Sequence, residues 1–264
     1  MIDFHNHILP NMDDGSKSLE MSLSMLRSAA EQGITDIVNT VHFQHPKVDG
    51  KDISFEACQP VLNALQAESD KAGFGIKLHL GAEVFYLPNL LDITDNPLVT
   101  FGGGKYMLIE FLTHHIPSTQ RQVLFDLKMK GITPIIAHPE RYRPVQEDME
   151  LVRRWIRSGC LIQVDAGSLT GALGKSAQHT ATEIVKLDLC QVLGSDAHDD
   201  HHRNFVISDA LQICEKLIGN RAQTLVESNP LKVLNGEPIV IDLDEDSRPK
   251  EKFYMKWIKK SRKK

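Results

Sequence analysis

The sequence is poor in cysteine, and its four cysteines show no pairing pattern. They are Cys58, Cys160, Cys190 and Cys214, which lie far apart in a chain of 264 residues and form no CxxC motif. Such spacing is typical of reduced, buried thiols and argues against a disulfide framework or a cysteine zinc site. A cysteine-dependent phosphatase also needs an arginine at a fixed short distance after its thiolate. No cysteine of this chain has one, which excludes that class of enzyme.

The sequence also lacks any segment that resembles a membrane span or a targeting signal. No apolar run approaches the roughly 20 residues of a membrane helix. The first residues do not form a charged segment followed by an apolar core. We therefore expect a cytoplasmic protein with no integral membrane segment. The formal net charge of -5 disfavours a nucleic-acid binder, because such proteins normally present a basic surface.

Apolar runs and amphipathic stretches alternate along most of the chain. The composition, 41% hydrophobic and 25% charged, is that of an ordinary globular protein, and 264 residues suit one α/β barrel. The predicted strands are residues 2–9, 34–41, 77–86, 106–112, 133–138, 160–165 and 191–195. The predicted helices are residues 18–32, 54–72, 118–130, 147–158, 175–187 and 205–218. Repeated strand and helix pairs favour a parallel sheet, and we expect it to close into a barrel.

Most of the predicted strands end in an imidazole or a carboxylate. In the opening run Ile2-Asp3-Phe4-His5-Asn6-His7, side chains of a strand would alternate between faces, so that His5 and His7 point the same way. Catalytic groups of α/β barrels collect at the carboxyl ends of the strands, where such residues would meet. Five later runs end in the same manner, at His42, Glu83, Glu110, His138, and the pair Asp196 and His198.

The chemistry of these residues indicates a site for several divalent metal ions. Imidazoles with carboxylates suit zinc, manganese or iron, and the absence of thiolates argues against a structural zinc site. One histidine on a strand is more often a hydrogen-bonded core residue. A buried carboxylate after each of several strands would however cost several kcal/mol without a partner, and metal ions remove that cost. Asp14 is a further candidate, although the sequence leaves open whether Asp14 or Asp13 turns toward the site.

The candidate ligands divide naturally into sets around separate ions. One set combines His5, His7 and Asp196 with a carboxylate such as Glu83. A second contains Asp14, His42 and His198. A third contains Glu110 and His138, with Glu83 as a bridge.

Two arginines follow candidate ligands closely and are predicted to bind phosphate. Arg141 lies three residues after His138, and Arg203 lies five residues after His198. Guanidinium groups bind phosphate oxygens in a bidentate manner. Asp165 also ends a predicted strand, where it either supports a ligand or caps a loop. We expect the remaining histidines to lie on the surface or behind the ligands; they are His45, His79, His114, His115, His179, His201 and His202.

The end of the chain differs in composition from the rest. We divide the chain into a barrel of residues 1–243, whose part 222–243 is predicted to form a terminal helix and an extended stretch, and a basic C-terminal tail of residues 244–264. From Lys250 to Lys264 the tail has eight basic residues and one acidic residue. This composition fits contact with an anionic membrane surface or an acidic partner. We favour the alternative that the tail is a solvated extension, because terminal segments are generally solvated.

Several of these motifs together resemble a known family. The motifs are His-Asn-His-Ile-Leu-Pro at 5–10, Asp-Asp-Gly at 13–15, His42, Gly-Ala-Glu at 81–83, His-Pro-Glu-Arg at 138–141 and Gly-Ser-Asp-Ala-His at 194–198. In order and spacing they resemble the polymerase-and-histidinol-phosphatase (PHP) superfamily over roughly residues 1–240. Within it, the chain resembles the bacterial manganese-dependent protein-tyrosine phosphatases of the CpsB/CapC type.

This resemblance implies a fold, a cofactor and an activity. The fold is a distorted (β/α)7 barrel, and the cofactor is a centre of three divalent ions, with manganese ahead of iron, zinc, magnesium or cobalt. The activity is hydrolysis of phosphotyrosine on a tyrosine autokinase that regulates capsule or exopolysaccharide synthesis, with Arg141 and Arg203 near the phosphate. The implied metal ligands are His5, His7, Asp14, His42, Glu83, Glu110, His138, Asp196 and His198.

Two other functions are compatible with the same residues. A phosphatase for a small phosphate monoester, such as histidinol phosphate, would use the same centre. A non-catalytic partner that docks on a polysaccharide-assembly kinase is the second alternative, although it would have no need for costly buried charges. Val41 and Phe43 flank His42, and the family usually has proline where Val41 stands. This difference would change the shape of the pocket, and so the substrate preference, more than the reaction. The oligomeric state is left open.

Overall fold

The computed structural model describes residues 1–241, so the proposed boundary at 243 and the basic tail lie outside the described residues. Seven parallel strands form one sheet in the order of the sequence. This topology confirms the expected (β/α)7 barrel. The strands are β1 (Ile2–Asn6), β2 (Asp36–Phe43), β3 (Lys77–Phe85), β4 (Tyr106–Glu110), β5 (Thr133–Ala137), β6 (Leu161–Asp165) and β7 (Val192–Gly194).

The barrel closes through contacts between β1 and the residues that follow β7. The amide of Asp196 donates to the carbonyl of His5 at 2.7 Å, and the amide of His7 donates to the carbonyl of Ala197 at 2.9 Å. The buried carboxylate of Asp3 accepts from both the amide and the hydroxyl of Ser195, each at 2.7 Å. The first and last strands are therefore joined by backbone and side-chain hydrogen bonds beside the candidate ligands.

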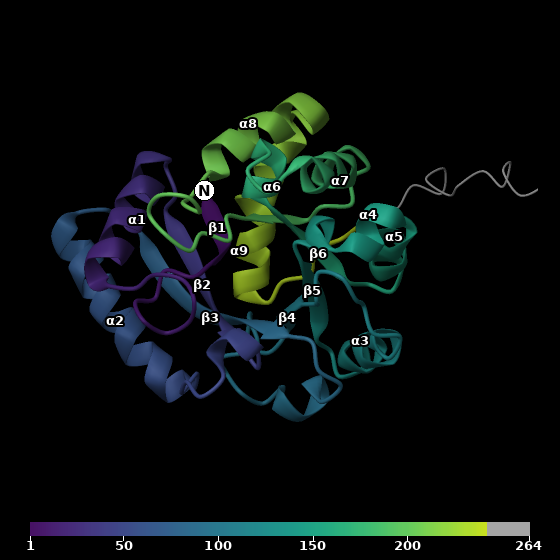
Figure 1. Cartoon of the computed structure of the whole chain (residues 1–264), viewed down its shortest axis with the longest axis horizontal. Coiled ribbons are helices and arrows are strands. Elements are labelled where there is room, and N and C mark those ends of the chain that lie inside the picture. The colour runs from purple at the N-terminus through teal and green to yellow at the C-terminus, as the bar shows by residue number, and fades with distance from the viewer. Residues whose placement is uncertain (242–264) are drawn as a thin grey trace, which may run out of the picture.

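Helices surround the strands and pack on their outer side (Figure 1). The six predicted helices are present within a few residues of their expected bounds, as α1 (Leu19–Glu31), α2 (Phe55–Ala72), α3 (Gln120–Met129), α5 (Glu150–Arg157), α7 (Lys175–Lys186) and α8 (Ile207–Ile218). Local capping explains where the first two begin, because Ser18 and Ser54 accept hydrogen bonds from the amides of Met21 and Ala57. α2 ends at Gly73, whose φ of 72° suits a left-handed cap.

Short helices occupy several of the connections. The sequence pattern did not predict α4 or α6, because a segment of five residues is too short to show helical periodicity. The short elements are α4 (Arg143–Glu147), α6 (Ala166–Thr170), η1 (Pro46–Val48), η2 (Leu90–Ile93), η3 (Pro139–Arg141) and η4 (Gly219–Leu225). Within residues 1–241, none of the helices combines the length and apolar character that crossing a membrane requires.

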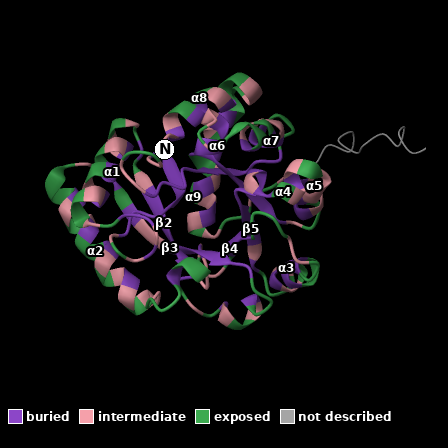
Figure 2. Cartoon of the chain, viewed as in Figure 1, coloured by how far each residue is buried: buried purple, intermediate pink, exposed green. Residues whose placement is uncertain are grey.

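Two separate groups of apolar side chains form the core. The larger group fills the space between the strands and the surrounding helices, whose outer faces are exposed (Figure 2). The smaller group lies inside the barrel and includes Phe4, Phe101 and Leu108, together with Val233 of α9 (Ser228–Asn235). In Figure 1, α9 runs across the middle of the ring of strands. These apolar residues fill the interior of the barrel below the carboxyl ends of the strands. The polar side chains at those ends therefore pack against an apolar layer.

The glycine-rich segment 102–104 forms a turn rather than a phosphate-binding loop. It lies between Phe101 and β4, with Phe101 and Tyr106 hydrogen-bonded to each other across it. Gly102 has a φ of 59°, and a Cβ atom there would lie 2.4 Å from the carbonyl oxygen of Val233. The turn thus requires glycine because α9 packs directly against its backbone.

Candidate metal centre

The structure brings all nine candidate ligands together at the carboxyl ends of the strands. Alternation along β4 places Glu110 on the same face as Leu108, a residue of the apolar group inside the barrel. Four overlapping sets of side chains each have potential ligand atoms within 4.8 Å of one another. The sets are His7, Asp14, His42 and His198; His5, His7 and Asp196; His5, Glu83 and His138; and His42, Glu83 and Glu110. Two of these sets resemble the first two expected from the sequence, whereas Glu110 and His138, expected in one set, fall in different sets that share Glu83.

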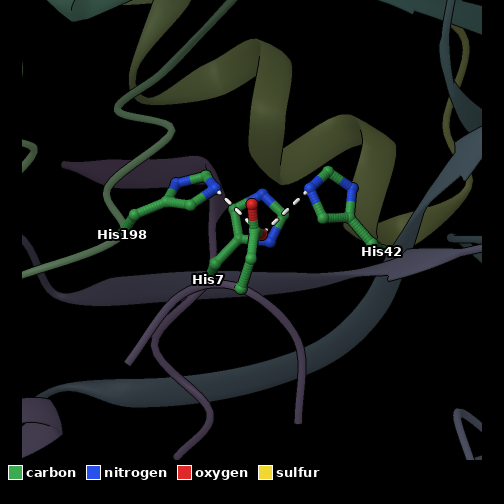
Figure 3. A group of neighbouring side chains, drawn as sticks. His7, His42 and His198 are labelled. Atoms are coloured by element: carbon green, nitrogen blue, oxygen red, sulfur yellow. Dashed lines mark ion pairs between the residues drawn. The ribbon is translucent and has the colours of Figure 1, made fainter. Parts of the chain in front are cut away.

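Three histidines and Asp14 form the outermost set. Figure 3 shows His198, His7 and His42 around a carboxylate, and the dashed lines mark its ion pairs with two of them. Oδ1 of Asp14 lies 3.2 Å from Nε2 of His42 and 3.3 Å from Nε2 of His198. The side chain of Asp14 is 30% exposed, whereas the histidines are buried. This set therefore faces the mouth of the site.

Glu83 lies at the centre of the cluster. Its Oε2 is 3.0 Å from Nδ1 of His42 and 3.3 Å from Nε2 of His5. Its Oε1 is 2.8 Å from Nε2 of His138. Because one carboxylate contacts histidines of different sets through its two oxygens, Glu83 has the geometry of a bridging ligand.

Two of the candidate ligands have unusual backbone conformations. His138 has a φ of 32° and Asp196 has a φ of 48°, both in the left-handed region that residues other than glycine rarely adopt. Each directly follows or nearly follows the end of a strand, β5 or β7. The sharp change of direction aims the side chain back over the barrel. Strain of this kind persists at functional sites where the surrounding structure enforces it.

Unsatisfied polar atoms show that the cluster fits metal ions. Seven buried ligand atoms make no hydrogen bond of good geometry within the described residues. Several of them lie within ion-pair distance of one another without completing a hydrogen bond, and a buried polar atom left without a hydrogen bond costs about 1–3 kcal/mol. Cations placed among them would satisfy imidazole nitrogens and carboxylate oxygens at once. The seven atoms are Asp14 Oδ1, His42 Nδ1, Glu83 Oε2, Glu110 Oε2, His138 Nδ1, Asp196 Oδ1 and His198 Nε2.

The electrostatics of the cluster also favour added positive charge. Burial, and then the neighbouring Glu83, raise the pKa of Glu110 to about 7. Burial opposes ionisation of Glu83, but His5 and His42 offset it and hold the pKa of Glu83 well below its usual range. Burial and the nearby Arg141 lower the pKa of His138 to about 4, so its imidazole is neutral at neutral pH. His138 thus offers a neutral imidazole beside the ionised Glu83, a pair of donors of the kind that divalent cations bind.

Asp13 and Asp14 have different roles in this geometry. Asp13 is buried and accepts hydrogen bonds from Nδ1 of His7 at 2.6 Å and from the amides of Gly15 and His42 at 3.0 and 3.1 Å. Asp14 belongs to the outermost set of potential ligands and Asp13 to none. Of the two aspartates that the sequence left open, Asp14 is the one whose carboxylate lies among the candidate ligands, and Asp13 contacts the candidate ligand His7.

Gln163 is a supporting residue that the sequence analysis missed. It lies on β6, and its Oε1 is 2.9 Å from Nδ1 of His5. With the pair of Asp13 and His7, this contact directs Nε2 of both histidines into the cluster, where the two Nε2 atoms lie 3.3 Å apart. The only signal in the sequence was a glutamine within an apolar predicted strand. This signal does not distinguish a residue that supports a metal ligand from a polar residue of the core.

Arg141 and Arg203 converge on one oxygen of the cluster. Nη1 of Arg141 and Nη2 of Arg203 each lie 2.5 Å from Oδ2 of Asp196. Nη1 of Arg141 is also 3.7 Å from Oδ2 of Asp165, whose other oxygen accepts from the amide of Gly167 at 2.7 Å and caps α6. Asp165 therefore both caps a helix and faces an arginine. The two guanidinium groups place positive charge at one side of the candidate centre.

One histidine expected to lie outside the ligand set also reaches the centre. His45 stacks on His42 with ring centroids 4.6 Å apart and contacts the edge of Phe85 at 4.8 Å. Its Nε2 is 3.6 Å from Oε2 of Glu110. It belongs to none of the four sets, which agrees with a position behind the ligands. His79, by contrast, pairs with Asp36 at the opposite end of the strands.

Together, the closed barrel and its buried cluster define an α/β-barrel protein with a candidate multinuclear metal centre. The chain belongs to the CpsB/CapC family of capsular polysaccharide synthesis, whose family model matches residues 1–235. The tyrosine-protein phosphatase YwqE of Bacillus subtilis (strain 168) is 34% identical over 242 residues, which are 90% of this chain and 93% of that protein. The tyrosine-protein phosphatase CpsB of Streptococcus pneumoniae is 31% identical over 249 residues, covering 89% and 98%.

Solved structures show the same fold. One described as YwqE from Bacillus subtilis and CpsB from Streptococcus pneumoniae, unique metal-dependent tyrosine phosphatases, matches with a TM-score of 0.85 and 33% identity, over 91% of this chain and 96% of that one. A histidinol phosphate phosphatase from Lactococcus lactis, complexed with zinc, histidinol and phosphate, matches with a TM-score of 0.54 and 16% identity, over 82% and 93%. The second likeness shows a shared fold alone.

Proposed function

We propose that the chain is a metal-dependent protein-tyrosine phosphatase. The observation that carries this proposal is the buried cluster of nine imidazoles and carboxylates, with two arginines converging on Asp196 beside it. The relatives named tyrosine-protein phosphatases support the choice of reaction, since they match nearly the whole chain. A tyrosine kinase of capsule or exopolysaccharide synthesis is the proposed phosphoprotein substrate, in keeping with the family.

The nine clustered side chains would hold the cofactor, which we infer to be three divalent ions with manganese foremost and iron, zinc, magnesium or cobalt as alternatives. When bound, such ions activate water and neutralise charge on a phosphoryl group. The mixed imidazole and carboxylate donors fit these metals. Asp13 and Gln163 would keep His7 and His5 in the tautomers that present Nε2 to the ions.

The arginines and Asp196 would position the phosphate. Oδ1 of Asp196 faces His7 at 3.2 Å, while Oδ2 faces both guanidinium groups. Phosphoryl oxygens placed on this side therefore lie between the arginines and the ligands. Arg141 and Arg203 each keep further N–H groups for bidentate contacts that strengthen as charge develops in the transition state. A tyrosine phenolate is a better leaving group than a serine alkoxide, since its pKa is only about 10, so little proton donation is needed.

The cysteines bear on the compartment in which this reaction would occur. All four thiols are free and buried, which fits a reducing compartment such as the cytoplasm. We infer that the chain meets its phosphoprotein there.

Phosphate release by metal-stripped protein tests the proposal. Manganese, zinc, magnesium, iron or cobalt is added back singly, with a phosphotyrosine peptide and histidinol phosphate as parallel substrates. We expect metal-restored release from the peptide and little from the metabolite. Release from histidinol phosphate alone would move the function to a small-ester phosphatase. No release from either substrate with any metal would favour a docking partner of the kinase instead.

A further inference from the structure

The loop between β2 and α2 lines an open hollow beside the candidate metal centre. The hollow has a volume of about 520 Å³ and is lined by Phe43, His45, Pro46, Val48, Lys51 and Ile53, among others. Pro46 and Lys51 are exposed, so the hollow opens to the surface. None of the nine candidate ligands lines it, and the proposed reaction assigns it no role.

The wall of the hollow lies against residues of the candidate metal centre. Gln44 has a φ of 58°, and this turn at the end of β2 returns the chain so that His45 stacks on His42. Lys51, on another wall, donates from Nζ to the carbonyl of Asp13 at 2.9 Å. Two lining residues thus contact the residues that form and support the centre. A substrate bound with its phosphate at the centre would lie next to this hollow.

We propose that the hollow is a subsite for an apolar side chain next to the phosphotyrosine of a peptide substrate. This inference rests on the proposed function and specifies its substrate class. Four of the lining residues, Phe43, Pro46, Val48 and Ile53, present apolar surface.

The charges around the hollow disfavour an acidic occupant. Asp49 and Lys51 contribute one charge of each sign to the lining, and Nζ of Lys51 donates to the carbonyl of Asp13 at 2.9 Å. The neighbouring Lys47 is already paired with Asp14, at 2.7 Å from Nζ to Oδ2. The lining therefore carries no excess positive charge that would select a carboxylate, and an apolar side chain is the occupant that its four apolar residues suit.

The size of the hollow separates peptides from small esters. Pockets of roughly 300–1,000 Å³ hold ligands of many atoms, so a hollow of about 520 Å³ offers much more space than one aryl ring beside the phosphate site needs. A small phosphate monoester could occupy the centre without reaching the loop. The subsite therefore provides affinity only to a substrate that continues beyond the phosphorylated residue.

Substrate pairs test the inference on the metal-loaded, full-length protein. Two phosphotyrosine peptides differ only in having leucine or aspartate on both sides of the phosphotyrosine, and p-nitrophenyl phosphate serves as an ester without flanking residues. We expect wild type to prefer the leucine peptide by about tenfold or more in kcat/KM, the discrimination that apolar pockets reach. Equal kcat/KM for the two peptides would overturn the subsite.

A filling substitution supplies the second test. Val48→Trp should abolish the preference for leucine, because the indole occupies the hollow, while Val48→Ala retains it. Leu231→Trp, on the exposed face of α9, is the matched control for adding an indole. An equal loss with p-nitrophenyl phosphate in Val48→Trp would instead place the effect at the metal centre and overturn the subsite. Hydrolysis of neither ester nor peptides by wild type would overturn the proposed function itself.

Discussion

Asp13 accepts a 2.6 Å hydrogen bond from Nδ1 of His7, and this contact determines which nitrogen of the imidazole faces the centre. With its proton on Nδ1, His7 would offer the lone pair of Nε2 to a cation, and this nitrogen lies 3.2 Å from Oδ1 of Asp196 and 3.3 Å from Nε2 of His5. The neighbouring Asp14 points into the centre itself. Of these two adjacent aspartates, Asp13 orients the candidate ligand His7, and Asp14 is itself a candidate ligand.

This division gives a prediction for the two aspartates. Asp13→Asn should weaken metal affinity and activity by about 10–100-fold, the usual cost of losing the partner of a metal-binding histidine. Asp14→Asn should remove a ligand of the outermost set and lower the number of bound ions. Metal content by mass spectrometry, beside kcat with added manganese, separates the two effects. An Asp13→Asn protein with wild-type manganese affinity would contradict the assignment.

The convergence of two arginines on Asp196 gives a second prediction. Arg203→Ala should lower kcat by about 10²–10³-fold, as expected for the loss of one group that stabilises transition-state charge. Its metal content should be retained, because Arg203 supplies no ligand. Arg203→Lys keeps the charge without the bidentate geometry and should recover only part of the rate. Full activity of Arg203→Ala would show that the guanidinium does not contact the phosphate.

Much of the fold was predictable because strand and helix periodicities are local. The seven strands and six long helices were placed within a few residues, and parallel strands necessarily bring residues such as Glu83 and Asp196 to one end of the barrel. The predicted strand 2–9 is too long, since β1 ends at Asn6 and the following residues leave the sheet to position His7. Strand ends of this kind depend on tertiary contacts, which no short window of sequence contains.

The supporting residues of the site were less predictable for a similar reason. Gln163 contacts His5 across 158 residues of sequence, and Asp3 joins Ser195 across 192. Periodicity tells which face of a strand a side chain occupies but not which distant atom it meets. The choice between Asp13 and Asp14 depends on side-chain direction in an irregular loop, where neither period applies.

Close packing between β1 and β7, where the barrel closes, gives a third prediction, for Gly194. A Cβ atom at this position would lie 2.5 Å from Cβ of His5 and 2.9 Å from Nε2 of Gln163. Gly194→Ala should therefore destabilise the protein by about 1–3 kcal/mol and weaken metal binding by displacing His5. Gly167→Ala is a milder control, because its nearest contact would be 3.2 Å. Thermal unfolding with and without manganese measures both effects, and unchanged values for Gly194→Ala would contradict the packing.

Protons and metal ions should compete for His42. Burial and the nearby His7 lower its pKa, but Glu83 and Asp14 offset them and raise the pKa of His42 to about 9 in the metal-free protein. The ion pairs of protonated His42 therefore contribute their full stabilisation to the metal-free protein at pH values below about 6.5, which is the pKa of a histidine in the unfolded chain. This contribution is lost as the pH rises through about 9. The melting temperature of metal-free protein should accordingly fall over this range.

Metal binding should depend on pH in the opposite direction, with apparent metal affinity rising as the pH rises. A ligand imidazole must be neutral, so binding at neutral pH displaces the proton of His42, and apparent affinity should rise by up to tenfold per pH unit for each proton released. Calorimetric titration with manganese at several pH values, in buffers of different ionisation enthalpy, counts the protons. His42→Asn serves as the control, because one released proton should disappear with the imidazole. Affinity that stays constant between pH 6.5 and about 8.5 would show that His42 is not a ligand, and the outermost set would then lack one of its three histidines.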